Sequence, residues 1–161
     1  MTFKPGYIYF IKDEFFQYVQ DPNLKINYAS TKRPHYYAVK DRKTDLLWFI
    51  PCSTKVEKFE RIIAKRKKNK RATPTIIIAK IAGKRAALLL QDMFPIAEKY
   101  VDSQYIWGGQ PVHVADADTV KQIERAANQV IGMIRAGIRF LPTQPDAMRI
   151  EQLMLEETQE K

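Results

Sequence analysis

Cysteine is almost absent from this chain of 161 residues: Cys52 is the single one, and it lies far from the two histidines, His35 and His113. One cysteine excludes an internal disulfide and is compatible with a reducing cytosol. One cysteine and two histidines at these separations match no zinc-binding spacing. We therefore expect a cytoplasmic protein that uses no metal and no other cofactor.

Long hydrophobic runs are also missing. No apolar stretch approaches the roughly 20 residues that a membrane-spanning helix needs, and the segment 1–6 lacks the apolar core of a signal peptide. The chain has no repeat, linker or low-complexity segment, so its length predicts one domain over residues 1–161. Hydrophobic residues still make up 45% of the chain, which is enough for a core.

Acidic residues are outnumbered, with 18 Asp and Glu against 27 Lys and Arg, for a net charge of +9. Nine of the cations and two glutamates fall between Lys55 and Arg71, a local charge of +7. A concentrated positive charge indicates an anionic partner, either nucleic acid or an acidic surface. A solvated helix end, with its cations near the negative pole of the helix dipole, is the alternative explanation.

The strand signals lie in the first two thirds of the chain. Runs of β-branched, aromatic and aliphatic residues predict strands at 7–11, 35–40, 45–50, 75–81, 85–91 and 99–106. Tyr37, Val39, Leu47 and Phe49 are the expected inward-facing residues of the second and third of these strands. Polar loops are expected at 23–34, which we predict to be mobile, and at 107–111, while 92–95 is expected to break the preceding strand.

Helical spacing of apolar residues marks the other elements. Short and long helices are expected from Asp13 to before Pro22, from Val56 into the basic run, from Asp118 or Thr119 to a C-cap at Gly137, and over 146–157. Most strands therefore precede the long helix. This segregation predicts an α+β fold, with a compact, strongly bent antiparallel sheet or barrel and helices packed on it.

The junction between the third strand and the second helix carries the strongest chemical signal. The apolar run 46–50 ends at Pro51, which has no N–H for a sheet ladder, and Ser53, Thr54 and Lys55 follow before the helix starts. Two hydroxyls and a cation beside the free N–H groups of a helix start suit a phosphate. The alternative is that Ser53 or Thr54 simply caps the helix.

Three segments together resemble a known family. In order and spacing, they resemble the RNase toxins of type III toxin–antitoxin systems, the ToxN/AbiQ family, and within it most nearly the CptN branch of the CptIN systems. The segments are 33–38 (RPHYYA), 48–58 (WFIPCSTKVEK) and 91–96 (QDMFPI). The resemblance extends from Tyr7 to the helix after Asp118, and its most specific part is the Ile-Pro-x-Ser-x-Lys junction.

This resemblance implies a metal-independent endoribonuclease with a compact, barrel-like sheet similar to that of the Kid/MazF toxins, and added helices. Such toxins cut a repetitive antitoxin transcript into small pseudoknotted RNAs. These antitoxin RNA repeats wrap the toxin in a closed ring of alternating protein and RNA, which blocks its activity. Freed toxin cleaves cellular RNA, halts growth and can abort phage infection.

The residues at the junction are of the types that RNA cleavage requires. RNA supplies its own nucleophile, the 2′-hydroxyl, and in-line attack needs a base, an acid and donors for the charged phosphorane. We expect Ser53, Thr54, Lys55 and His35 to be catalytic, His35 because its reference pKa is about 6.5.

The ToxN branch has a lysine where this chain has His35. That departure leaves open whether His35 is acid, base or phosphate contact, with Lys32 or Arg33 taking the electrostatic part instead. On sequence alone, His35 is equally well read as an exposed strand histidine.

The expected RNA-binding residues extend beyond this set. They are Lys32, Arg33, Tyr36, Lys58, Lys65, Arg66, Lys67, Lys68, Lys70 and Arg71. Tyr36, Tyr37 and Trp48 are otherwise core residues, although a tyrosine at this site also suits base stacking. Cys52 fits a small buried residue better than a thiol nucleophile. The competing functions are a non-catalytic RNA-binding module and, more weakly, a DNA-binding or gyrase-directed toxin on a related barrel.

Overall fold

The structure is a computed structural model that describes residues 1–69 and 75–159. In these residues the helices are α1 (Asp13–Val19), α2 (Val56–Lys68), α3 (Ala117–Arg135) and α4 (Ala147–Gln159), with short 3-10 turns η1 (Leu90–Asp92) and η2 (Glu98–Tyr100). The strands are β1 (Ile8–Ile11), β2 (Pro34–Lys40), β3 (Leu47–Ser53), β4 (Ile76–Ile81), β5 (Lys84–Leu89), β6 (Phe94–Ile96), β7 (Val101–Gln104), β8 (Ile106–Trp107) and β9 (Gln110–Pro111).

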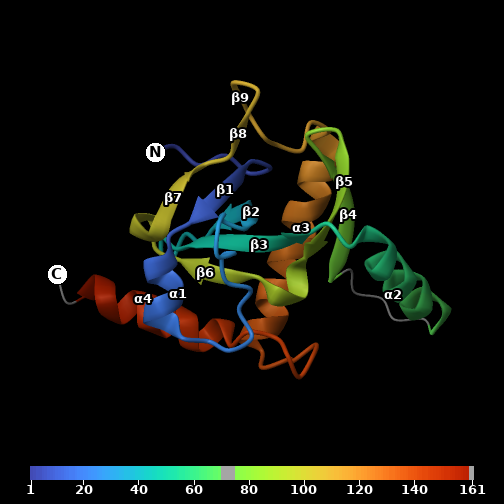
Figure 1. Ribbon diagram of the computed structural model, residues 1–161. Coiled ribbons are helices and arrows are strands. Elements are labelled where there is room, and N and C mark those ends of the chain that lie inside the picture. Colours follow the sequence, from blue (N-terminus) through green and yellow to red (C-terminus); the bar gives the residue numbers. More distant parts are fainter. Residues whose placement is uncertain (70–74, 160–161) are drawn as a thin grey trace.

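Seven strands form one antiparallel sheet in the order β4-β5-β3-β2-β1-β7, and β6 pairs with β3 beside this path. The sheet bends between its β1–β2 half and its β4–β5 half, while α2 projects away from the rest of the molecule (Figure 1). Within the described residues the outer strands β4 and β7 do not pair, so the sheet is open. The α+β class and the bent antiparallel sheet are confirmed, and the barrel alternative is not realised.

Both faces of the central strands are buried. Trp48 and Ile50 belong to a core under α3, whereas Tyr37 and Phe49 belong to a second core with α1 and α4. Alternation along a strand explains this split, because successive side chains point to opposite faces. A register shift between Tyr37 and Val39 puts Val39 against the α3 core, so Val39 faces inward as expected but packs in a different core from Tyr37.

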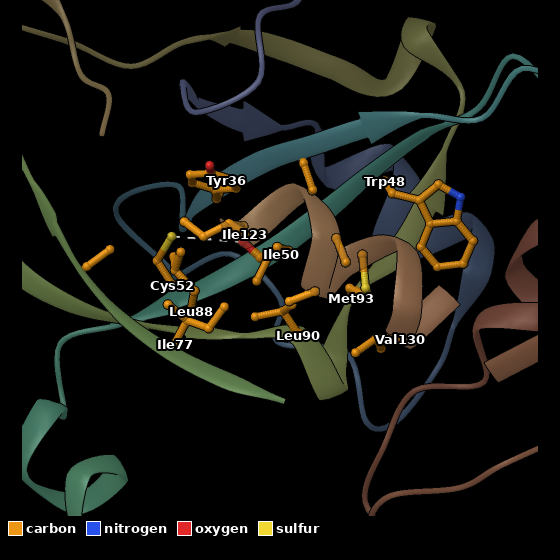
Figure 2. Close-up of a cluster of buried hydrophobic side chains, with 14 of the residues drawn as sticks. Tyr36, Trp48, Ile50, Cys52, Ile77, Leu88, Leu90, Met93, Ile123 and Val130 are labelled. Atoms are coloured by element: carbon orange, nitrogen blue, oxygen red, sulfur yellow. Dashed lines mark hydrogen bonds between the residues drawn. The ribbon is translucent and has the colours of Figure 1, made fainter. Parts of the chain in front are cut away.

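Helix α3 covers one face of the sheet. The helical spacing predicts seven apolar positions on its buried side. Val120 is partly buried, and the other six are buried: Ile123, Ala126, Ala127, Val130, Ile131 and Ile134. Figure 2 shows Ile123 and Val130 over Ile50 and Leu90. The helix starts earlier than expected because Asp116 is its N-cap and accepts a hydrogen bond from the N–H of Asp118 at 3.4 Å. Gly137 follows the C-cap Ala136 with a φ of +87°, which glycine adopts easily.

The opposite face carries two separate groups of helices. Phe15 and Phe16 of α1 and Ile150 and Met154 of α4 pack on the half formed by β1, β2, β3 and β6. Helix α2 packs through Phe59 on the β4–β5 half. Asp13 is the first residue of α1 rather than its cap, because Lys12 occupies the N-cap position. No helix in the described ranges is long and apolar enough to cross a membrane.

Proline does not end the strands as the sequence predicts. β3 continues through Pro51 to Ser53, and β6 forms in spite of Pro95 in the segment expected to break a strand. Pro51 pairs with His35 of β2, but on its other side it falls between the β6 partners of 47–49 and the β5 partners of 52–53. A missing N–H costs little where no strand is registered opposite it. The loop expected at 107–111 contains the small β8–β9 hairpin.

Candidate functional site at the β3–α2 junction

Ser53 ends β3 and Lys55 is the N-cap residue of α2, so both stand at a strand-to-helix turn. The Oγ atom of Ser53 accepts a hydrogen bond from the N–H of Lys55 at 3.2 Å, and the carbonyl of Thr54 accepts one from the N–H of Val56 at 2.8 Å. Thr54 and Lys55 are exposed and Ser53 is half-buried. The capping alternative is wrong in its simple form, because α2 has no side-chain cap and neither Ser53 nor Thr54 is its N-cap residue.

The β2–β3 register places His35 on the same face of the sheet as Ser53. His35 lies directly opposite Pro51, and Ser53 follows two residues later on the same strand. Side chains in such a diagonal relation are roughly 7–8 Å apart. The sheet therefore places His35 and Ser53, 18 positions apart in the sequence, on one face, and Lys55 follows Ser53 by two residues at the start of α2.

His35 is buried, with 0% of its surface exposed, so the alternative of an exposed strand histidine is wrong. Its ring lies 5.6 Å from that of Phe94 and 6.4 Å from that of Phe16, measured between ring centroids. Nδ1 lies 3.0 Å from the carbonyl oxygen of Arg33. A carbonyl can only accept, so Nδ1 carries the proton and Nε2 carries the lone pair of a neutral ring.

The electrostatics of His35 favour this neutral form. Burial lowers the pKa of His35 to about 4, and the nearby charge of Arg33 acts in the same direction, against the hydrogen bond to the Arg33 carbonyl. Nε2 is buried without a hydrogen-bond partner in the described part of the chain. At neutral pH the ring can accept a proton, but it carries no positive charge with which to hold a phosphate.

The segment before His35 is held in place by one side chain. Asn27 donates to the carbonyl of Ile11 and to the carboxylate of Asp13, each at 2.8 Å, and accepts from the N–H of Arg33 at 2.9 Å. The guanidinium of Arg33 stacks 4.4 Å over the ring of Tyr28. The loop expected at 23–34 is thus irregular, as predicted, but anchored at its centre.

Lys32 faces acidic neighbours. Its ammonium lies 4.0 Å from the carboxylates of both Asp13 and Asp102. Its charge is therefore partly balanced by the protein, which weakens it as an isolated phosphate contact.

The expected RNA-binding cations of α2 divide into two groups. Lys58, Lys65, Lys67 and Lys68 are exposed along the helix. Arg66 instead points inward and donates to Thr75 Oγ1 at 2.5 Å and to Gln91 Oε1 at 3.3 Å. This network ties α2 to η1, so Arg66 has a structural role in this conformation. Lys70 and Arg71 lie outside the described residues.

Two further predicted residues belong to the α3 core. Tyr36 is 1% exposed, its hydroxyl is buried, and burial raises its pKa. Its ring offers no free face for a base, so the structure places it where stacking on RNA is not possible. Cys52 is buried as expected, and burial raises the pKa of its thiol to about 12, which keeps it protonated.

Sequence reasoning missed a buried carboxyl close to this region. Asp92, treated above only as part of a strand break, is 7% exposed in η1, two residues before Phe94, which contacts His35. Burial raises the pKa of Asp92 to about 6, and the charge of Lys25 opposes this shift. The sequence did contain a signal for this burial, because Asp92 is an acidic residue within the mostly apolar segment 88–94. Among the described residues no three His, Cys, Asp or Glu side chains gather as metal ligands would.

The burial of His35 predicts how the stability of the protein depends on pH. Its pKa is depressed in the folded state, so the unfolded chain takes up the proton first as the pH falls below about 6.5. The unfolding free energy of the wild type, relative to His35→Asn, should therefore fall by about 3 kcal/mol between pH 6.5 and 4, at 1.36 kcal/mol per pKa unit. Urea unfolding of both proteins across this range measures the difference.

Asp92 acts in the opposite sense, because its raised pKa makes the folded state lose stability as the pH rises from about 3.8 towards 6. The contribution of Asp92 is the same in the wild type and in His35→Asn, so it cancels in the difference between their unfolding free energies. Asp92→Asn is the control: it should remove the loss of stability with rising pH that Asp92 causes and leave the effect of His35 unchanged. A difference between wild type and His35→Asn that stays constant with pH would contradict a neutral, buried His35.

Comparison with solved structures finds proteins of similar fold. No family model matches the chain, and no curated protein matches it. The fold is similar to that of AbiQ, a lactococcal anti-phage endoribonuclease belonging to the type III toxin–antitoxin system, with a TM-score of 0.72. The match covers 97% of this chain and 99% of AbiQ at 13% sequence identity. At this identity the likeness establishes the fold alone: this chain has an AbiQ-like fold.

Proposed function

We propose that this protein is a metal-independent endoribonuclease toxin of a type III toxin–antitoxin system, and that it cuts RNA at the β3–α2 junction. The observation that carries the proposal is that His35 and Ser53 share one face of the sheet, with Lys55 two residues beyond Ser53 at the start of α2, in a fold similar to that of AbiQ. The sequence resemblance to the ToxN/AbiQ family rests on the same residues, and the finer assignment to the CptN branch rests on that resemblance alone.

The proposed reaction uses the nucleophile that RNA already carries. The 2′-hydroxyl attacks the adjacent phosphorus, the 5′-oxygen of the next nucleotide leaves with a proton, and a 2′,3′-cyclic phosphate remains. Negative charge builds up on the phosphorane oxygens during this step. Lys55 and the hydroxyls of Ser53 and Thr54 are exposed or half-exposed donors at the place where that charge would form.

Among the roles left open for His35, we favour the general base. The neutral ring with its lone pair on Nε2 is the form that accepts a proton. The lowered pKa disfavours the other two roles, general acid and cationic phosphate contact. Because His35 is fully buried, RNA reaches Nε2 only after the side chains that cover it move. Lys55, rather than His35, supplies the positive charge for the phosphate.

We also propose an antitoxin RNA as partner, processed from a repetitive transcript into pseudoknots that close a ring with the toxin. Cellular and phage RNA are the substrates of the free enzyme. The exposed cations of α2, which projects away from the sheet, provide a surface for this RNA next to the cleavage site (Figure 1). A non-catalytic RNA-binding module is the competing function, and cleavage measurements distinguish the two.

The first prediction concerns the two junction residues. Ser53→Ala and Lys55→Ala should each lower single-turnover RNA cleavage by on the order of 10²–10³, as expected for loss of one transition-state donor. Ser103→Ala on β7 and Lys121→Ala on α3 are matched controls of the same residue types and should cleave normally. Thermal unfolding checks that all four variants fold. If both junction variants cleave RNA at the wild-type rate, Ser53 and Lys55 are not catalytic residues.

The product identifies the mechanism. We expect the purified protein to cut single-stranded RNA in excess EDTA and to leave a 2′,3′-cyclic phosphate, because the attacking group is the 2′-hydroxyl. Mass spectrometry of the 5′ fragment distinguishes this end from a 3′-hydroxyl. A 3′-hydroxyl product, or cleavage that requires added Mg²⁺, would refute the proposed chemistry.

The α2 cations should bind RNA without taking part in cleavage. Lys67→Gln/Lys68→Gln should weaken the salt dependence of RNA affinity, with a change in log–log slope of about 1.4 for two lost contacts to a single strand. Single-turnover cleavage of a short RNA at saturation should not change. Lys121→Gln/Arg149→Gln removes two exposed cations from α3 and α4 and is the matched control. If the salt dependence of RNA affinity is unchanged in the α2 variant, these lysines do not contact RNA and belong to a solvated helix end.

A further inference from the structure

A pocket lies on the face of the sheet opposite to that of Ser53. Its volume is about 470 Å³, and it is bounded by the β2–β3 turn and by the side of α3 that carries Glu124 and Asn128. Trp48 of β3 forms part of its wall, Lys40 is the last residue of β2, and Arg42 and Lys43 belong to the turn. The pocket therefore combines an aromatic wall with a rim that is mostly charged.

Trp48 lines this pocket and carries a hydrogen-bond donor, the indole N–H, that has no partner in the described residues. Its side chain is 0% exposed, and its Nε1 is buried without a partner in the described residues. Figure 2 shows the indole at the end of the α3 core, with its nitrogen turned away from the other labelled side chains. An indole N–H can only donate, and a buried donor left unpaired costs roughly 1–3 kcal/mol. Because the indole nitrogen is buried, an acceptor in the pocket reaches it only after the side chains that cover it move, as for Nε2 of His35.

The charges around the pocket favour an anion. Asp41 is already engaged: it pairs with Arg135 and accepts from the N–H groups of Lys43 at 2.8 Å and Thr44 at 3.3 Å. Arg135 is shared with Glu151 at 2.8 Å. In the described part of the chain no carboxylate lies within 4.0 Å of the Lys40, Arg42 or Lys43 head groups. Three available cations therefore face one unpaired acid, Glu124.

We propose that this pocket binds a phosphate of the RNA backbone and is a second RNA contact, separate from the cleavage site. The choice of RNA as the source of the phosphate rests on the proposed function. Trp48 and Ser53 are five residues apart on β3 and point to opposite faces. At about 3.3 Å per residue this separation is roughly 17 Å. A long RNA can reach both sites by passing around the sheet, whereas a short substrate occupies the cleavage site alone.

The indole N–H of Trp48 reports directly on this pocket. The chain has two tryptophans, so a ¹H–¹⁵N spectrum has two indole signals, and Trp107→Phe assigns them. Wild-type protein in EDTA is titrated with a 2′-O-methyl RNA, whose blocked 2′-oxygen prevents cleavage by the proposed mechanism. We expect the Trp48 indole proton to shift downfield as it gains an acceptor. Adenosine 5′-monophosphate at matched phosphate concentration tests a free nucleotide as the ligand.

Charge removal at the rim supplies the second measurement. Arg42→Gln/Lys43→Gln should abolish the Trp48 shift and lower the salt slope of long-RNA affinity by about 1.4. Cleavage of a short RNA should not change. Lys121→Gln/Arg149→Gln removes the same charge away from this pocket and should retain the shift.

The outcomes separate this proposal from the proposed function. RNA binding without a change in the Trp48 signal, or a shift that persists in Arg42→Gln/Lys43→Gln, would contradict the proposed phosphate site and would not affect the proposed nuclease function. A shift with the mononucleotide but not with RNA overturns RNA as the ligand. A shift with RNA in a protein that never cleaves RNA supports the pocket and overturns the nuclease. Absence of any RNA binding overturns both.

Discussion

The antiparallel pairing of β2 with β3 is the constraint on which the rest of this structure depends. It sends Trp48 and Ile50 into the core under α3 and Tyr37 and Phe49 into the core under α1 and α4. A shift of one residue would exchange these two sets and leave neither core filled. The same register puts His35 opposite Pro51, so the packing of two cores also determines which polar side chains share a face with Ser53.

Pro51 links this sheet to the junction. It occupies the one stretch of β3 where neither β6 nor β5 is registered, so the strand continues past it and reaches β5 at Cys52 and Ser53. Ser53 is thereby held by a strand on one side and by the start of α2 on the other. A hydroxyl fixed in this way, with an exposed lysine at the adjacent helix start, is suited to stabilise charge on a phosphate. Trp48, near the opposite end of β3, lines the pocket beside the β2–β3 turn, where we propose that a second phosphate binds.

Local patterns in the sequence predicted the parts of the fold that local physics decides. The spacing from Ile123 to Ile134 identifies the buried side of α3, and the change from an apolar run to Ser53, Thr54 and Lys55 identifies the junction. Burial of His35 was not predictable, because Phe16 and Phe94 reach it from distant elements. The inward position of Arg66 depends on Thr75 and Gln91 in the same way. A count of cations cannot distinguish such a residue from its exposed neighbours.

The central claim is that the scissile phosphate sits at the β3–α2 junction. The most direct measurement is a crystal structure of the protein with an RNA that carries a single 2′-deoxy nucleotide at the mapped cleavage position. We predict that the phosphate after this nucleotide lies within hydrogen-bond distance of Ser53 Oγ and close to the Lys55 ammonium, with the sugar directed towards His35. A phosphate bound elsewhere on the protein, with Ser53 and Lys55 free of contact, would contradict it.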